Sequence, residues 1–338
     1  MRSNGTGGRE GGGYEGGGFW FRGPNNNIRN NVAANIMSDG PDAGYGFKFF
    51  QYYLGNINVP NFKGADLSVA GQYITMDGHS LPVLEFADNE IYGATGSGFT
   101  YWWIGSFGNG YPRATQDTMF KNLHIWHVFN KAIFHYENMR IIFDGLVIRG
   151  KDPTANPACC GSGVAMNDYV AHDVTFRNVD IQGMGSGITA STVSGGGLQT
   201  IENSYLRNLT DFNQGTIWTS SADSSWVSPR KVIIRNTRLD AWPGRPLVTI
   251  SRPWDPTLSA STNTTQKDEL FVYDYQAQAG NNFQVYYKEQ ATQNIAGGLA
   301  PCNDTTTRPE ISGITCPLGG TPPPSPTVPL APSVLRVQ

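Results

Sequence analysis

The chain has 338 residues, a net charge of −3 and a charged fraction of only 15%, together with 41 glycines and 12% aromatic residues. The slight negative charge argues against a nucleic-acid groove, which requires a basic stripe. Apolar runs long enough to span a membrane, about 18 residues, are also missing from the sequence. This composition favours a β protein with many loops.

Residues 1–18 are rich in glycine and lack the apolar core of a signal peptide. We expect them to form a disordered lead. A repeat pattern begins almost immediately afterwards without an evident cap, although solenoids normally need caps. We therefore expect the chain to be the C-terminal part of a longer, multidomain protein that is secreted or lies at the cell surface as a monomer, with its signal peptide upstream.

A short pattern recurs along the chain, most clearly in residues 120–125 (FKNLHI) and 143–148 (FDGLVI). An apolar residue is followed by a charged residue, by Asn or Gly at a position that we call the slot, and by Ile or Leu three residues later. Eight copies have spacings of 34, 24, 34, 23, 33, 25 and 33 residues. The slots are Asn30, Gly64, Asp88, Asn122, Gly145, Asn178, Asn203 and Asn236.

A period of about 20–50 residues indicates a repeat architecture in which each unit buries its apolar face against its neighbours. We expect one short strand in most of each unit. Positions that repeat from copy to copy form columns: the two apolar columns, before and after the slot, would point inside, and the charged column just before the slot would face water. Asn in the slot suits a tight bend because it tolerates the αL conformation, and stacked Asn side chains can bond to each other. The pattern predicts a right-handed parallel β-helix with a loop on every second coil.

The predicted fold class is therefore all-β, with the parallel β-helix over residues 19–300. Two β-rich runs within residues 270–300 would form the last coil and a C-terminal cap, and residues 301–318 a disulfide-stapled part of that cap. Residues 319–338 are rich in proline and are expected to form a stiff linker. The last eight residues of the linker are similar to the first strand of a fibronectin type III-like module that the chain does not include.

Residues 19–50 carry a family resemblance. The runs at 19–27 (FWFRGPNNN), 31–34 (NVAA) and 44–47 (GYGF) resemble a segment of the secreted hyaluronidase-like β-helix proteins, which include the cell-migration-inducing hyaluronidase and bacterial relatives. The match covers about 30 residues, and a weaker β-helix similarity continues to about residue 245. The resemblance implies an extracellular β-helix and chemistry on glycans. It provides no catalytic residue for this chain.

Residues 92–118 form the most aromatic region and include Tyr101, Trp102 and Trp103. Flat aromatic rings can stack on sugar rings, so we predict that these three residues bind substrate. The alternative is that they cover the apolar core, because large aromatic side chains bury well. Adjacent strand residues point to opposite faces, so at most one of Trp102 and Trp103 would face a ligand.

The column two residues after the slot supplies candidate catalytic residues. It contains Asp66, Glu90 and His124 in successive copies, and neighbouring coils of a β-helix lie about 4.8 Å apart. Two carboxylates about 5 Å apart match the pair of a retaining glycosidase, and their proximity raises one pKa. The same carboxylates suit Ca²⁺ as a cofactor. A solvated charge ladder is the alternative without function.

Two further patterns concern metals and disulfides. His124 and His127 are three residues apart and point to opposite faces of a strand, so we predict no zinc site. Cys302 and Cys316 close a short loop in a tail with little core, and a disulfide there fits an oxidising compartment. Cys159 and Cys160 are adjacent, which standard disulfide geometry does not favour.

The sequence as a whole predicts a protein that binds or cleaves an extracellular polysaccharide and has no nucleic-acid partner and no membrane span. A hydrolase would use Asp66, Glu90 and His124. A non-catalytic adhesin or glycan-binding stalk, and a polysaccharide lyase, are the alternatives that the residues leave open.

Overall fold

The computed structural model describes residues 16–21, 23–24, 26–37, 44–50, 56–60, 68, 71–77, 81–105, 114–150, 161–166, 171–190, 198–214, 231–250, 269–286 and 308–318. The regular structure in this part of the chain is almost entirely strand, with short 3-10 turns such as η4 (Tyr275–Ala277). The strands form three large sheets and one hairpin.

Sheet A contains β1 (Phe19–Phe21), β4 (Phe47–Phe50), β9 (Ser97–Trp102), β12 (Lys131–Tyr136), β15 (Ser162–Ala165), β18 (Ser186–Thr189), β21 (Thr210–Gln214) and β24 (Val248–Ile250). Sheet B contains β2 (Asn27–Arg29), β7 (Glu85–Ala87), β10 (Thr118–Lys121), β13 (Asn138–Asp144), β16 (Ala171–Arg177), β19 (Leu198–Glu202), β22 (Lys231–Arg235), β25 (Glu269–Tyr273), β26 (Phe283–Tyr286) and β27 (Ile314–Pro317). Sheet C contains β3 (Val32–Ile36), β8 (Glu90–Ala94), β11 (His124–Trp126), β14 (Val147–Arg149), β17 (Asp180–Gln182), β20 (Tyr205–Arg207) and β23 (Arg238–Leu239). The hairpin pairs β5 (Asn56–Pro60) with β6 (Tyr73–Asp77) in antiparallel fashion.

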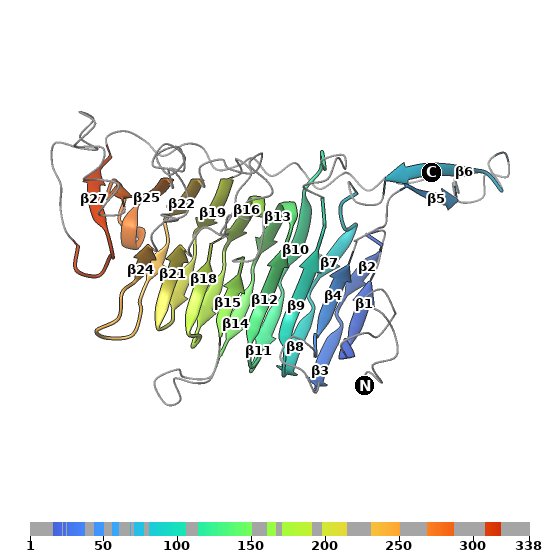
Figure 1. Cartoon of the computed structure of the whole chain (residues 1–338), viewed down its shortest axis with the longest axis horizontal. Coiled ribbons are helices and arrows are strands. Elements are labelled where there is room, and N and C mark those ends of the chain that lie inside the picture. The colour runs from blue at the N-terminus through green and yellow to red at the C-terminus, as the bar shows by residue number, and fades with distance from the viewer. Residues whose placement is uncertain are drawn as a thin grey trace, which may run out of the picture.

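The chain passes through sheets A, B and C in turn and then returns to sheet A, so that each circuit forms one coil. Strands of successive coils pair in parallel, and Figure 1 shows the coils stacked side by side from β1 to β24. We number the coils 1 to 8 from the N-terminal end, the first consisting of β1, β2 and β3. The predicted all-β parallel architecture is confirmed in this form, that of a β-solenoid, but each coil has three strands where the sequence predicted mostly one.

The slot is the bend that joins sheet B to sheet C. In the described coils it is occupied by Asn30, Asp88, Asn122, Gly145, Asn178, Asn203 and Asn236, all with φ between 44° and 77°. The predicted bonds between stacked side chains are also present. Asn236 Nδ2 donates to Asn203 Oδ1 over 2.8 Å, and Asn122 Nδ2 donates to Asp88 Oδ1 over 2.8 Å. The short amide therefore both tolerates the left-handed bend and links consecutive coils.

The copy centred on Gly64 is not a coil, which corrects the predicted register. Strand β2 pairs directly with β7, with Ile28 opposite Phe86 and Arg29 opposite Ala87. Asn30 and Asp88 are therefore the slots of neighbouring coils, although 58 residues separate them in the sequence. The hairpin of β5 and β6 lies within that interval and stands apart from the stack in Figure 1. Gly64 itself is outside the described residues.

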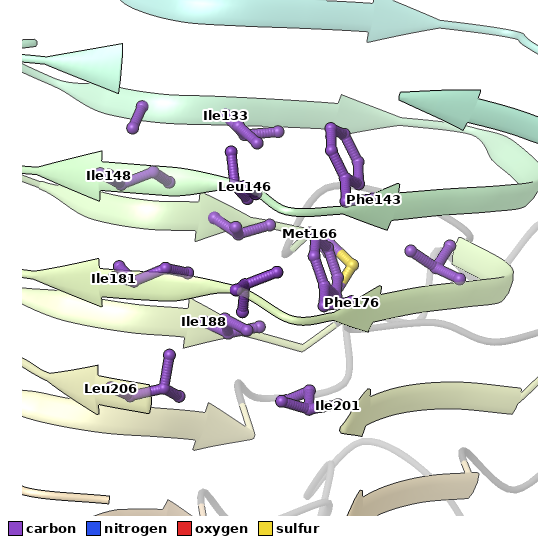
Figure 2. Packing of buried hydrophobic residues seen from close by; sticks show 14 of the residues in the cluster. Ile133, Phe143, Leu146, Ile148, Met166, Phe176, Ile181, Ile188, Ile201 and Leu206 are labelled. Atoms are coloured by element: carbon purple, nitrogen blue, oxygen red, sulfur yellow. The ribbon is translucent and has the colours of Figure 1, made fainter. Parts of the chain in front are cut away.

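The core runs through the middle of the coils and consists of the predicted apolar columns. Figure 2 shows Ile148, Ile181 and Leu206 in one column and Phe143, Phe176 and Ile201 in another. The rings of Phe143 and Phe176 are stacked with centroids 5.3 Å apart. Each fully buried side chain of this size contributes roughly 1.5–3 kcal/mol to folding, so a column that repeats on every coil stabilises the whole stack.

The charged column of sheet B points outward as predicted, and its signs alternate along Lys121, Asp144, Arg177, Glu202 and Arg235. Arg177 Nη2 lies 2.7 Å from Asp144 Oδ2. Glu202, however, is buried, so this part of the column does not face water.

The C-terminal end of the stack is closed by antiparallel strands. Strand β26 pairs with β25, and β27 pairs with β26, while Ile311 forms a parallel bridge with Val248 at the end of sheet A. Antiparallel pairing thus begins at β26, before residue 301. Cys316 in β27 forms a disulfide bond. Cys302, the predicted partner, and Cys159 and Cys160 lie outside the described residues, as do residues 1–15 of the glycine-rich lead and the proline-rich tail.

Candidate functional site

Sheet C has the most accessible outer face. Within its described strands every inward side chain is buried and no outward side chain is buried. The outer faces of the other two sheets differ. Thr100 and Thr189 of sheet A are buried, as are Ile142 and Thr200 of sheet B, although all four alternate with residues of the core and point outward. A large ligand therefore has most access at sheet C.

The outward side chains of sheet C form two rows that run along the stack. The first row consists of Val32, Glu90, His124, Val147, Asp180, Tyr205 and Arg238, each opposite the next in the strand pairing. The second row consists of Ala34, Tyr92, Trp126, Arg149, Gln182 and Arg207. The first row is the column that the sequence predicted to face solvent, apart from one member.

That member is Asp66, which lies outside the described residues. The two strands beside Glu90 place Val32 on one side and His124 on the other. The strand position next to Glu90 that was predicted for Asp66 is therefore occupied by Val32. A pairing of the Asp66 and Glu90 side chains stays a prediction, because Asp66 is not among the described residues. The predicted register differs here because it counted a coil centred on Gly64, whereas β2 pairs directly with β7 and the hairpin of β5 and β6 lies between them in the sequence. Glu90 and His124 lie opposite each other on neighbouring strands, as predicted.

Aromatic side chains lie at the end of sheet C nearer the N-terminus. Tyr92 is 46% exposed, and its ring meets the ring of His127 edge to face with centroids 6.0 Å apart. His124 meets Trp126 edge to face at 6.0 Å. His127 follows β11 with φ 50°, a left-handed conformation that turns the chain out of the strand. We call Tyr92, His124, Trp126 and His127 the aromatic end.

A polar group occupies the middle of the face, on coils 4 and 5. Arg149 Nη2 donates to Asp180 Oδ2 over 2.5 Å, and Gln182 Nε2 donates to Asp180 Oδ1 over 2.7 Å. Arg149 Nη1 also donates to the backbone oxygen of Asp180 over 3.0 Å. About a third of the Arg149 and Asp180 side chains is exposed. This arrangement presents fixed donors and acceptors to the solvent.

The other end of the face combines arginine with aromatic rings. Arg207 lies over the ring of Trp242 at 5.2 Å, and Arg238 lies over the ring of Tyr205 at 5.6 Å. The hydroxyl of Tyr205 donates to Asp240 Oδ2 over 2.9 Å. We call Tyr205, Arg207, Arg238, Asp240 and Trp242 the arginine end. Since arginine covers a face of each ring, we expect this end to bind by hydrogen bonds more than by stacking.

Asp211 supports the arginine end from inside. It is fully buried and accepts hydrogen bonds from the backbone N–H of Asn208 at 2.8 Å and of Asp240 at 2.7 Å. Burial raises the pKa of Asp211 to about 7, although these N–H donors act to lower it. Asp211 does not reach the surface and is not available to a ligand. Its hydrogen bond from the Asp240 N–H holds the backbone of Asp240 in place.

The predicted stacking residues lie on a different sheet. Tyr101 points into the core, is fully buried and forms a 3.1 Å contact between its hydroxyl and His135 Nδ1, so it offers no surface to a sugar. Trp102 points outward from β9 and is half-buried. Trp103 leaves the strand with φ 60°, and its indole N–H donates to Glu137. Glu90 on sheet C and the predicted stacking residues Tyr101 and Trp102 on sheet A thus lie on different sheets.

Sequence analysis missed the second row. Its members stand four residues after each slot, so the same alignment contains them, with Tyr92 and Trp126 in consecutive coils. Only the column two residues after the slot was predicted to face solvent. Residues two apart on a strand point to the same face, so the column four residues after the slot lies on the same outer face as the column two residues after it. This alternation is the signal in the sequence that identifies the second row.

Within the described residues, no three side chains of His, Cys, Asp or Glu are grouped so that they could hold a metal ion. The helices of the same part of the chain include none that is long and apolar enough to cross a membrane. No protein family model, curated protein or solved structure matches this chain. The resemblance to the hyaluronidase-like proteins therefore stays a prediction.

Proposed function

We propose that this chain is a secreted, right-handed parallel β-helix that binds an extracellular polysaccharide on the outer face of sheet C. The observation that carries the proposal is that the outward side chains of sheet C are all accessible and include aromatic rings next to fixed polar groups. Sugar-binding sites need both, because rings cover the apolar faces of sugars while polar groups bond to hydroxyls.

Two general rules support the remaining parts of the proposal. Connections between parallel strands of one sheet are right-handed in nearly all proteins, which favours a right-handed solenoid. Disulfide bonds persist in oxidising compartments, and Cys316 forms one, which favours secretion.

Depolymerisation is a second candidate function, because Glu90 and His124 are lateral neighbours on the same face. Neighbouring strands lie about 4.8 Å apart, and a carboxylate and an imidazole on such strands can serve as a general acid and a general base. A retaining glycosidase needs two carboxylates about 5–5.5 Å apart. The strand neighbours of Glu90 are Val32 and His124, and neither is a carboxylate. A second carboxylate such as Asp66 would have to reach Glu90 from outside sheet C. Binding is therefore the function that the geometry supports best.

The test is a panel of plant, animal and bacterial polysaccharides, measured for retention of the folded chain. The same mixtures are assayed for new reducing ends and for unsaturated products, with and without Ca²⁺. Trp126→Ala and Tyr92→Ala should each weaken binding by about tenfold, the equivalent of 1.4 kcal/mol, whereas Trp102→Ala on sheet A is the matched control and should not. Glu90→Gln should abolish product formation in a hydrolase and spare binding in an adhesin. Failure of the folded chain to bind any polymer would contradict the proposal.

A further inference from the structure

The two rows of sheet C run along the stack, so the face is long in the direction of the solenoid axis and narrow across it. Each strand contributes two outward residues at most in the described coils 3 to 7, whereas each row extends over six or seven coils. A ligand that used the whole face would therefore have to be elongated and to lie across the strands.

The spacing along this direction is regular. Neighbouring strands of a sheet lie about 4.8 Å apart, and the pairing of β8, β11, β14, β17 and β20 is in register without a shift. From Tyr92 on coil 2 to Arg207 on coil 6 there are four such steps, or about 19 Å. One sugar unit of an extended, equatorially linked glycan advances the chain by nearly the length of one step.

The chemistry changes along the same direction. The aromatic end offers the exposed ring of Tyr92, the middle offers Arg149, Asp180 and Gln182, and the arginine end offers the Arg207 guanidinium. A sugar at the aromatic end would therefore be stacked on a ring, while sugars further along the face would be held through hydrogen bonds to their hydroxyls.

We propose that the ligand of sheet C is a linear glycan in an extended conformation that lies parallel to the solenoid axis, with about one sugar unit on each coil. This inference rests on the proposed function. It excludes chain ends, compact helical glucans and single terminal sugars as the preferred ligands, because none of these spans both ends of the face.

The experiment uses the full chain and size-fractionated oligomers of cellulose, chitin and hyaluronan, together with amylose oligomers as a helical control. Binding is measured for oligomers of increasing length from two sugar units. For the extended glycan that binds, affinity should rise with each added unit until about five units cover the coils from Tyr92 to Arg207, and amylose oligomers should show no such rise.

Two variants at opposite ends of the face make the test sharper. Tyr92→Ala and Arg207→Gln should both weaken binding of a hexamer, by about tenfold each. A trimer covers only one end, so one of the two variants should weaken its binding and the other should leave it unchanged. Phe129→Ala, at an exposed aromatic side chain outside both rows, is the control and should have no effect on either oligomer.

The outcomes separate this inference from the proposed function. Binding that depends on Tyr92 but does not increase beyond two or three units would overturn the axial arrangement and leave glycan binding in place. Binding that ignores both variants would place the ligand elsewhere and overturn both proposals. An affinity that rises with length and depends on both ends supports the axial chain.

Discussion

At the scale of single residues, the slot shows how one position combines backbone geometry and side-chain chemistry. Gly145 is the exception in a series of Asn and Asp residues, and its φ of 77° lies in the left-handed region. An added Cβ there would lie 2.5 Å from Asn122 Oδ1, whose side chain donates to Asp88. Glycine at this coil therefore leaves room for the side chain of the preceding slot.

Gly145→Ala should destabilise the protein by about 2 kcal/mol, because an L-residue in the left-handed region costs about 1–2 kcal/mol and the Asn122 side chain must move as well. Gly244→Ala is the matched control, since Gly244 has φ 78° but no atom within 4 Å of the added Cβ. Urea denaturation of both variants separates the two effects. Equal losses would show that the contact with Asn122 carries no cost.

Asp211 makes a second prediction at this scale. Its pKa is about 7 in the folded protein, and the ordinary value of an aspartate is 3.8. Between these pH values the folded state binds more protons than the unfolded state, so the contribution of Asp211 to stability falls as the pH rises from about 4 to about 7.

The measurement is the free energy of unfolding of the wild type minus that of Asp211→Asn at several pH values. The subtraction removes the other titrating groups. The difference should decrease by up to about 4 kcal/mol over this range and stay constant above it. An increase with pH would show instead that the N–H donors hold Asp211 as a carboxylate.

At the scale of elements, the aromatic column of sheet B connects consecutive coils through ring contacts in the core. Phe143 is fully buried, stacked on Phe176 and 5.0 Å from the ring of Phe120. Phe143→Ala should cost about 3–5 kcal/mol because it opens a cavity between three coils. Phe129→Ala removes a ring that is 62% exposed and should cost less than about 0.5 kcal/mol. Thermal unfolding of the two variants checks this contrast, and similar midpoints would contradict the packing described.

The hairpin of β5 and β6 gives another prediction for an element. Strands β2 and β7 pair without it, so replacing residues 56–77 by a flexible linker should leave the stack folded and sheet C able to bind its glycan. Circular dichroism and the thermal midpoint test the first expectation. Collapse of the fold would show that this segment is a coil after all, as the register through Gly64 assumed.

At the scale of the whole molecule, the repeat made most of the architecture predictable. From Asp88 onward each slot, each apolar column and the outward column two residues after the slot lie where the sequence placed them, since a parallel stack needs the same residue types at the same positions on every coil. Gly64 misled the register because residues 62–64 have the same apolar, charged and Gly order as a true slot. A local pattern does not distinguish a coil from an inserted hairpin of similar length.

The candidate site was less predictable for a related physical reason. Whether an outward residue is accessible depends on what covers its sheet, and this is not encoded in the alternation along the strand. Thr100 and Tyr92 both point outward, yet only Tyr92 is exposed. Tyr101 and Trp102 are likewise adjacent in sequence, and the inward position of Tyr101 follows only once the start of β9 is known.

The central claim is that the outer face of sheet C contacts the polysaccharide, and hydroxyl-radical footprinting read by mass spectrometry tests it most directly. The folded chain is labelled with and without the polysaccharide that it retains. We predict that Tyr92 and Trp126 become protected from oxidation, while Trp102 at the end of β9 in sheet A and Trp103, which follows it, keep their rates. Protection of Trp102 and Trp103 alone would contradict the account and move the ligand to the other sheet.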